Sequence, residues 1–336
     1  MQTRTIAENW ANDATWLIQA LDPHARLARL VRMDIQAYRN ISFLDDRMLG
    51  SGVEQRLVSL DELIERCKTL PTYRGGWIFH IGHVGSTLIS RLLGELPLVL
   101  PVREPRSLRD LGFFEADERV RITPLIARAM MRPLSDRSMP IIKATSFVSE
   151  LAPALVAEGQ PCLMLTASPA NYVATILAGP NSRSELEALY SQRKERLASR
   201  GIHLTDWPMD AAHMAAAAWA CEATSLEQAA VELGASARFQ DFDDALRNMV
   251  DTLIGIAGHF GIQLPIGDAK EIVAGPQMRR YSKAQEYDYS PALRRQLLDE
   301  ATTTNLLAIN AALDRLHQAS QDAPLLATAL ARSMKG

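Results

Sequence analysis

The chain has 336 residues, of which 47% are hydrophobic and 22% are charged, and its formal net charge at pH 7 is −3. This length and composition predict one large domain or two smaller ones, either of which can bury a full core. A charge so close to zero gives no global basic field, so we expect neither nucleic acid nor an anionic membrane as a partner.

Cysteine usage and apolar runs predict a cytoplasmic protein. Cys67, Cys162 and Cys221 are widely spaced, which fits reduced thiols better than a disulfide framework or a zinc site. The N-terminus lacks a signal-type apolar core. The longest apolar run, residues 214–221, is far too short to span a bilayer.

The first 75 residues are predicted to form a helical N-terminal extension. Residues 1–40 have apolar side chains at helical spacing in each half, which predicts two helices. Asp22-Pro23 is the expected cap and first turn between them. A short helix is predicted at 60–70, ended by Pro71.

The stretch 76–93 has the pattern of a buried strand, a tight glycine turn and a helix. Residues 76–81 are apolar and aromatic, and the apolar spacing from Thr87 onward is helical. Such a turn directs several backbone N–H groups and the positive end of the helix dipole at one spot. We therefore expect it to bind an anion such as phosphate or sulfate. The turn consists of Gly82, His83, Val84, Gly85, Ser86 and Thr87.

Further apolar runs predict strands at 96–101, 140–146, 161–167 and 235–240. Helical patterns separate or follow them, at 107–133, 169–177, 183–200, 208–233, 241–260, 291–318 and 323–334. Strands that alternate with helices predict a parallel sheet with helices on both faces. We find no internal repeat or linker, so residues 76–336 are predicted to form one compact α/β domain with a helix-rich C-terminal half.

The turn departs from the phosphate-binding loop of proteins that hydrolyse ATP or GTP. That loop has Gly, four residues, Gly, Lys and then Ser or Thr. With Thr87 in the last position, Ser86 stands where the lysine should be and His80 where the first glycine should be. No predicted strand ends in the acidic residue that helps to hold Mg²⁺. Ordinary nucleotide hydrolysis is therefore not expected.

Residues 77–179 resemble the P-loop sulfotransferase-like proteins, with weaker similarity at 278–295. The chain resembles in particular bacterial relatives with a Phe-His-x-x-x-x-x-Ser-Thr-Leu turn, here Phe79 to Leu88. The resemblance implies a P-loop NTPase-like parallel sheet flanked by helices, with a degenerate phosphate-binding loop. It also implies that the loop binds the 5′-phosphosulfate of 3′-phosphoadenosine 5′-phosphosulfate without a metal. On this pattern Gly85, Ser86 and Thr87 match Gly-Thr-Thr.

The same resemblance implies catalytic roles for three residues. His83 takes the place of the basic residue in the loop. Glu104 follows the second predicted strand, where several of these enzymes have the base that deprotonates the acceptor hydroxyl. Lys143, at the end of the third predicted strand, resembles a lysine that stabilises charge on the transferring group.

Recognition of the 3′-phosphate is the weakest part of the resemblance. Where sulfotransferases usually have Arg-Asp-Pro, this chain has Ala167-Ser168-Pro169. Sulfotransferases also have a serine eight residues beyond that arginine, and Thr175 stands at this place. Alanine cannot supply the charge-assisted hydrogen bonds of a guanidinium. Either a basic residue of the C-terminal segment supplies that charge, or the donor is a different one. The candidates are Arg279, Arg280 and Lys283.

The resemblance thus implies a sulfotransferase-like transferase that takes a nucleotide donor and an acceptor hydroxyl or amine. The acceptor's identity and the oligomeric state stay open. Two alternatives also stay open: a non-catalytic nucleotide- or anion-binding P-loop protein, favoured by the missing loop cation and the missing arginine, and an atypical phosphotransferase.

Purely structural roles are alternatives for individual residues. Glu104 can pair with Arg103 or Arg106, and Thr175 can hydrogen-bond back to a carbonyl of its own helix. His80 ends a strand, which favours a buried histidine with satisfied hydrogen bonds.

Overall fold

The computed structural model describes residues 10–50, 52–204, 206–280 and 290–334 of the chain. In this part the strands are β1 (Trp16–Asp22), β2 (Leu27–Arg32), β3 (Gln55–Ser59), β4 (Gly76–His80), β5 (Val99–Arg103), β6 (Met139–Lys143), β7 (Cys162–Thr166) and β8 (Ala237–Asp241). The α-helices are α1 (Ile35–Asn40), α2 (Leu60–Lys68), α3 (Ser86–Gly94), α4 (Arg106–Asp110), α5 (Ala116–Met130), α6 (Ala152–Leu155), α7 (Pro169–Ala178), α8 (Pro180–Ser199), α9 (Ala211–Leu233), α10 (Phe242–Arg247), α11 (Met249–His259), α12 (Ile266–Ala274), α13 (Pro291–Thr304), α14 (Leu306–Ser320) and α15 (Pro324–Ser333). Short 3₁₀ helices are η1 (Trp10–Asn12), η2 (Asp46–Met48), η3 (Leu111–Phe113), η4 (Ser146–Leu151), η5 (Gly234–Ser236) and η6 (Pro276–Met278).

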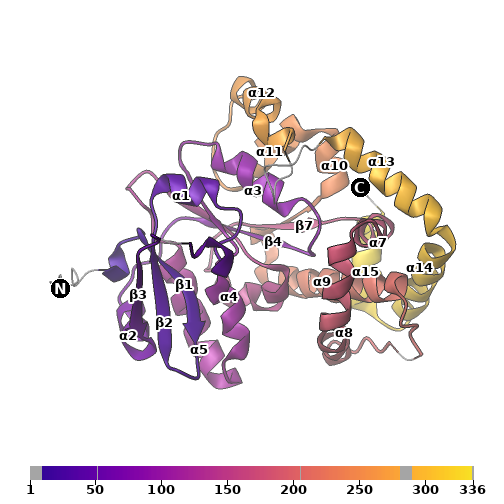
Figure 1. The fold of residues 1–336 in the computed structure, drawn as a ribbon, viewed down its shortest axis with the longest axis horizontal. Coiled ribbons are helices and arrows are strands. Elements are labelled where there is room, and N and C mark those ends of the chain that lie inside the picture. The colour runs from indigo at the N-terminus through magenta and orange to yellow at the C-terminus, as the bar shows by residue number, and fades with distance from the viewer. Residues whose placement is uncertain (1–9, 51, 205, 281–289, 335–336) are drawn as a thin grey trace.

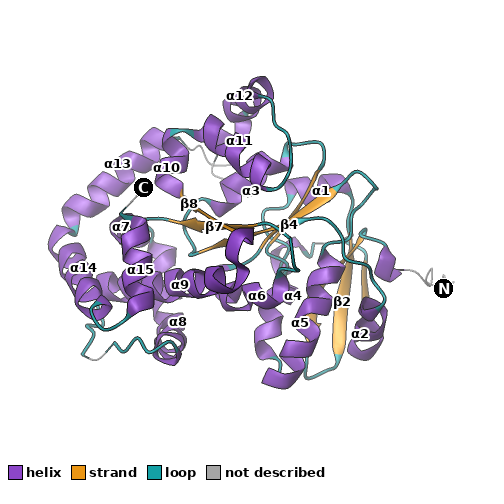
Figure 2. Cartoon of the chain, turned by 180° about the vertical axis from the view of Figure 1, so that it is seen from behind, coloured by secondary structure: helices purple, strands orange, loops and turns teal. Residues whose placement is uncertain are grey.

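Strands β4 to β8 form a five-stranded parallel sheet in the order β5-β6-β4-β7-β8. Every residue of β4, β5 and β6 is buried, as expected for a parallel sheet that helices cover on both faces. Figures 1 and 2 show α3 and α11 over one face of the sheet and α6 and α9 over the other. The predicted α/β class with a helix-rich C-terminal half is confirmed.

The order of the strands brings distant segments to one edge of the sheet. β4 lies between β6 and β7, and the chain adds β5 and β6 on one side before it adds β7 and β8 on the other. The carboxyl end of β4 is therefore the point where the strand order changes direction. Open α/β sheets bind their ligands at such a point.

The two helices predicted within residues 1–40 are wrong over residues 16–32, which form β1 and β2. The helix predicted at 60–70 is confirmed as α2, and the end of the second predicted helix is α1. β1, β2 and β3 form an antiparallel sheet, which lies at one end of the molecule in Figure 1. The predicted helix cap at Asp22 is instead the last residue of β1, and its carboxylate accepts a hydrogen bond from the Ala25 N–H in the turn that leads to β2. All residues of β1 except Asp22 are buried, so no alternation of polar and apolar residues marks it as a strand.

Two buried arginines join this antiparallel sheet and α1 to the rest of the chain. The Arg132 guanidinium donates to the backbone oxygens of Trp10, Ala11, Asp13 and Trp16. The Arg103 guanidinium, at the end of β5, donates to the backbone oxygens of Tyr38, Arg39 and Ile41. The second set includes the last carbonyls of α1, which attract a cation because they carry the negative end of the helix dipole.

Other predicted elements agree in type and differ in their bounds. The helices predicted at 241–260 and 291–318 are each divided into two, giving α10 with α11 and α13 with α14. The helix α12 lies in a segment for which the sequence predicted no element. Within the described ranges, no helix is both long enough and apolar enough to cross a membrane.

Candidate functional site

Residues 81–85, here called the glycine loop, connect β4 to α3. Gly82, His83 and Gly85 have φ values of +84°, +54° and +62°. Glycine adopts this left-handed backbone without penalty, whereas His83 is strained in it. At Gly85 a side chain is also excluded by space, because a Cβ there would lie 1.9 Å from the Phe242 ring. The predicted turn is thus one that needs its second glycine for two independent reasons.

The first turn of α3 follows the glycine loop directly. Its N–H groups have no preceding helical turn to bond to, and the N-cap residue, Gly85, has no side chain to cap them. Thr87 is 1% exposed, and its hydroxyl has no hydrogen-bond partner among the described residues. Helix N–H groups, the helix dipole and an unsatisfied hydroxyl together suit an oxyanion. Val84 contributes its backbone, since its side chain is buried in the core.

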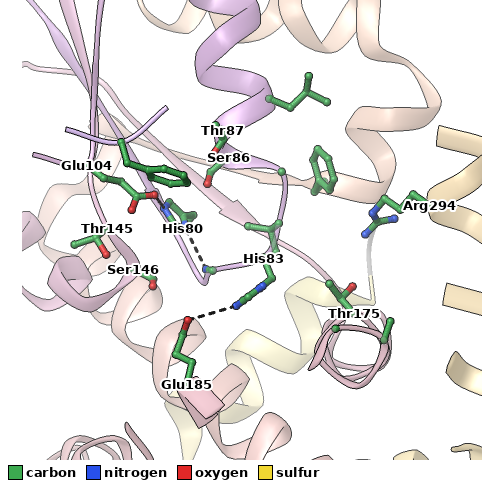
Figure 3. Close-up of a pocket in the computed structure, with 18 of the residues that line it drawn as sticks. His80, His83, Ser86, Thr87, Glu104, Thr145, Ser146, Thr175, Glu185 and Arg294 are labelled. Carbon is green, nitrogen blue, oxygen red and sulfur yellow. Dashed lines mark hydrogen bonds and ion pairs between the residues drawn. The ribbon is translucent and has the colours of Figure 1, made fainter. Parts of the chain in front are cut away.

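The glycine loop opens on a cavity of about 700 Å³. Its wall includes every turn residue from Gly82 to Thr87, and also residues from η2, α4, α7, α8 and α13. Charged side chains of both signs line it: four arginines (Arg47, Arg109, Arg280 and Arg294) and three carboxylates (Asp45, Glu104 and Glu185). Figure 3 shows His83 pointing into the space between Glu185, Thr175 and the loop.

Glu104 and Lys143 are held together at the ends of β5 and β6. The two strands pair Arg103 with Lys143, and the Glu104 N–H donates to the Lys143 backbone oxygen at 2.7 Å. The Lys143 ammonium bonds to Glu104 Oε1, and its side chain is only 1% exposed. Glu104 lines the cavity and Lys143 does not. Lys143 therefore contacts the predicted base, rather than the space where a transferring group would lie.

The electrostatic surroundings of Glu104 favour its ionised form. Burial by itself acts to raise the pKa of this carboxyl group. The charge of Lys143 and the nearby His80 ring outweigh burial and hold the pKa of Glu104 well below its ordinary value. His80 Nε2 lies 3.7 Å from Glu104 Oε1. In this arrangement Glu104 is an ionised carboxylate with a low affinity for a proton.

His83 has a carboxylate partner on α8. His83 Nε2 lies 3.9 Å from Glu185 Oε2 (Figure 3), and its ring contacts the edge of Tyr172 at a centroid distance of 6.3 Å. Glu185 also accepts a hydrogen bond from the buried Arg193 at 3.3 Å. The structure thus brings His83 into the cavity beside a carboxylate that can balance a charge on its imidazole.

The residues predicted to recognise a 3′-phosphate do not all meet. Thr175 lines the cavity, but its hydroxyl donates to the Asn171 backbone oxygen at 2.7 Å, which is the structural role left open for it. Ser168 caps α7 by accepting from the Asn171 N–H at 3.2 Å and does not line the cavity. Arg279 is exposed outside the cavity wall, and Lys283 lies outside the described residues. Arg280 lines the cavity.

Arg294 and Arg47 are among the residues of the cavity wall that the sequence analysis did not single out. Arg294 of α13 lies over the Phe242 ring at 5.2 Å and donates to Asp243 at 2.5 Å. On the opposite side, the Arg47 guanidinium lies 3.8 Å from the centre of the Phe43 ring. Neither stretch of sequence carries a motif, because both residues reach the cavity only through the packing of segments far from the glycine loop in the sequence.

Comparison with solved structures finds sulfotransferases at low sequence identity. A sulfotransferase domain from the curacin biosynthetic pathway is 11% identical, and the match covers 68% of this chain and 91% of that domain at a TM-score of 0.41. Mouse sulfotransferase SULT7A1, complexed with PAP, is 9% identical over 81% of this chain and 95% of its own, at a TM-score of 0.40. Sulfotransferase STF9 from Mycobacterium avium is 13% identical over 71% and 79%, at a TM-score of 0.35.

No protein-family model and no curated protein matches the sequence. The TM-scores of the three structures lie between 0.35 and 0.41, so no activity is transferred from them to this chain. The chemistry that the cavity supports follows from the residues that line it.

Proposed function

We propose that this chain is a sulfotransferase-like enzyme that moves a sulfuryl group from 3′-phosphoadenosine 5′-phosphosulfate to an acceptor hydroxyl or amine. The observation that carries the proposal is that one cavity is lined both by the glycine loop and by Glu104. The loop offers an oxyanion site, and Glu104 offers a proton acceptor beside it. A transfer reaction between an anionic donor and a protonated nucleophile needs these two functions in one space.

The glycine loop and the start of α3 would hold the 5′-phosphosulfate end of the donor. The N–H groups of the first helical turn and the unsatisfied Thr87 hydroxyl are the groups that support this assignment. His83 would add positive charge when protonated, with Glu185 as its partner. Among the described residues on the C-terminal side, Arg280 and Arg294 are cations of the cavity wall, and either can bond a 3′-phosphate.

Glu104 would accept the proton of the acceptor as the acceptor oxygen or nitrogen forms its bond to sulfur. The bond between sulfur and the bridging phosphate oxygen breaks in the same exchange, and the nucleotide leaves as 3′-phosphoadenosine 5′-phosphate. While Lys143 is bonded to Glu104, the low pKa of Glu104 makes it a weak base. If Lys143 turns toward the transferring group, Glu104 loses that charge but stays buried, and its pKa rises. The same movement gives Lys143 the contact predicted from the sequence.

A second candidate function is a non-catalytic nucleotide- or anion-binding protein. The specific observation that favours it is the Lys143–Glu104 ion pair, which occupies both predicted catalytic groups with each other. In this alternative the pair stabilises the edge of the sheet, and the glycine loop only binds.

Calorimetric titration separates these functions. We expect adenosine 3′,5′-bisphosphate to bind without a metal and more tightly than ATP with Mg²⁺. Thr87→Val keeps the shape of the side chain and removes the hydroxyl, and it should weaken nucleotide binding about tenfold, as a lost hydrogen bond to a charged group does. Thr123→Val is the matched control, because Thr123 is a buried threonine of α5 whose hydroxyl bonds within its helix.

Transfer of labelled sulfuryl from the phosphosulfate donor to a panel of alcohols and amines then tests catalysis. Nucleotide binding with no transfer in the panel, and no effect of Glu104→Gln on slow donor hydrolysis, would favour the non-catalytic function. Tighter binding of ATP with Mg²⁺ would instead contradict the sulfuryl donor and point to a phosphotransferase.

A further inference from the structure

His80 connects the glycine loop to Glu104 through its two ring nitrogens. It is the last residue of β4 and is 5% exposed. Its Nδ1 accepts a hydrogen bond from the Gly82 N–H at 3.0 Å, and its Nε2 lies 3.7 Å from Glu104 Oε1. Figure 3 shows the ring between the loop and the carboxylate. Because Nδ1 accepts, the neutral ring must carry its proton on Nε2, on the side of Glu104.

The charged groups that face Glu104 and His80 come from several elements. Lys143 of β6 bonds to the same carboxylate oxygen that His80 approaches. Arg47 of η2 adds positive charge near Glu104 and is itself held by Asp45. Arg109 of α4 lines the same cavity. Of these groups, His80 is the one that also bonds to the backbone of the glycine loop.

We infer that His80 is a positioning residue that ties the conformation of the glycine loop to the Glu104 carboxylate. The inference rests on the proposed function for the reaction that Glu104 serves, whereas both contacts of His80 lie within this chain. A change at either contact of the His80 ring affects the other. The nitrogen that accepts from the Gly82 N–H determines which nitrogen carries the proton that faces the Glu104 carboxylate. A loop that withdraws the Gly82 N–H from Nδ1 removes the constraint that points the Nε2 proton at Glu104.

Two substitutions at His80 separate its two contacts. Asparagine places its amide oxygen near the position of Nδ1, so His80→Asn can keep the bond to the Gly82 N–H but cannot reach Glu104. Glutamine places its amide nitrogen near the position of Nε2, so His80→Gln can keep the bond to Glu104 but loses the one to the loop. Hydrogen exchange of the Gly82 amide reports the first contact, and a carbon-13 NMR titration of the Glu104 carboxyl reports the second.

In His80→Gln we expect exchange of the Gly82 amide to accelerate about tenfold or more, as for an amide that loses its hydrogen bond, with the Glu104 titration close to wild type. In His80→Asn we expect the reverse: near wild-type exchange, and a Glu104 pKa higher by about one unit because the ring proton that approaches the carboxylate is gone. A role in packing alone would change both readouts together in both variants, or neither, and either result overturns the inference.

A measurement on the wild-type protein tests the inference even if neither His80 variant folds. Nitrogen-15 NMR of the histidine rings distinguishes the two neutral tautomers, and we expect His80 to carry its proton on Nε2 at neutral pH. A proton on Nδ1 would overturn the inference without any substitution. None of these readouts uses the donor or the acceptor, so a failure of the proposed transfer reaction leaves their result intact, and the reverse also holds.

Discussion

At the scale of single residues, Glu104 combines a strained backbone with a strong ion pair. Its φ of +49° lies in the left-handed region that non-glycine residues avoid. Two bonds hold this conformation. The Glu104 N–H donates to the Lys143 backbone oxygen, and the Lys143 ammonium bonds to the Glu104 carboxylate. Backbone strain held by two bonds at the end of a strand is typical of a functional site, and it suits a carboxylate that must face a cavity.

Replacing Glu104 by Gln should destabilise the protein. The Lys143 ammonium would remain buried beside a neutral amide, and a buried pair that loses one partner typically costs about 3 kcal/mol in the free energy of unfolding. Chemical denaturation at pH 7 measures the change. The double variant Glu104→Gln with Lys143→Met removes both charges and should recover most of the loss. A double variant as unstable as the single one would contradict this explanation.

The cost of the Glu104→Gln substitution should also depend on pH. Pairing holds the folded-state pKa of Glu104 below its ordinary value of 4.5, so the ion pair contributes fully at higher pH. As the pH falls from about 4.5 toward that lower pKa, protonation removes the contribution from the wild type. The difference in unfolding free energy between wild type and variant should therefore shrink on acidification. A difference that grows instead would mean that the pair does not stabilise the fold.

At the scale of elements, the unit formed by β4, the glycine loop and α3 depends on its neighbour α10. Phe242, the first residue of α10, packs against the position where a side chain on Gly85 would lie. The glycine loop can therefore lie close to the N-terminus of α10 only because residue 85 is a glycine. This contact links the glycine loop to β8, the strand that precedes α10.

Gly85→Ala should weaken both the fold and nucleotide binding. The new Cβ would collide with the Phe242 ring, and alanine at a φ of +62° is strained, which together predict a loss of about 2 kcal/mol. Denaturation and calorimetric titration measure the two effects. Gly112→Ala is the matched control, because nothing lies within 4 Å of its Cβ position. In Gly85→Ala with Phe242→Leu the collision is relieved and only the backbone strain should remain.

At the scale of the whole molecule, the cavity is built from both ends of the chain. Its wall joins η2 from the N-terminal part to α13 from the C-terminal part, with the glycine loop between them in sequence. In Figure 1 the antiparallel sheet and α13 to α15 lie at opposite ends of the molecule, on either side of the parallel sheet. Neither end can be removed without opening the cavity.

Arg103→Met tests whether the N-terminal part unfolds with the parallel sheet. Burial lowers the pKa of Arg103 to about 9, but its guanidinium meets three backbone carbonyls that would otherwise be unsatisfied. We expect one cooperative transition in urea, shifted by about 3 kcal/mol. Arg121→Met, on the exposed side of α5, is the control. Two separate transitions in the wild type would instead show that residues 1–75 form a unit of their own.

Arg294→Gln tests whether α13 completes the donor site. If Arg294 bonds a 3′-phosphate, its loss should weaken adenosine 3′,5′-bisphosphate about tenfold and adenosine 5′-monophosphate much less. Competition titrations of the two nucleotides give this ratio. Arg295→Gln, at the exposed neighbouring position of α13, should change neither affinity. An equal loss for both nucleotides would place Arg294 away from the 3′-phosphate.

Local sequence was sufficient where a structure depends on neighbours along the chain. The run from Trp77 to His80, the glycine turn and the helix after it were predicted correctly, because strand burial, left-handed glycines and helical spacing are properties of adjacent residues. The positions of Glu104 and Lys143 at the carboxyl ends of two strands followed from the same pattern, whereas the pairing of those strands came from the structure. Their roles in transfer stay a prediction.

Only the tertiary structure decided what these residues contact. β1 is buried on both faces by segments distant in sequence, so its apolar spacing could not distinguish a strand from a helix. The ion pair of Lys143 with Glu104, the two contacts of His80 and the position of Arg294 at the cavity all depend on packing between elements. The sequence by itself determined a parallel α/β sheet with a glycine turn between a buried strand and the helix that follows it. Burial and distance, which exist only in the folded chain, determined which charges meet there.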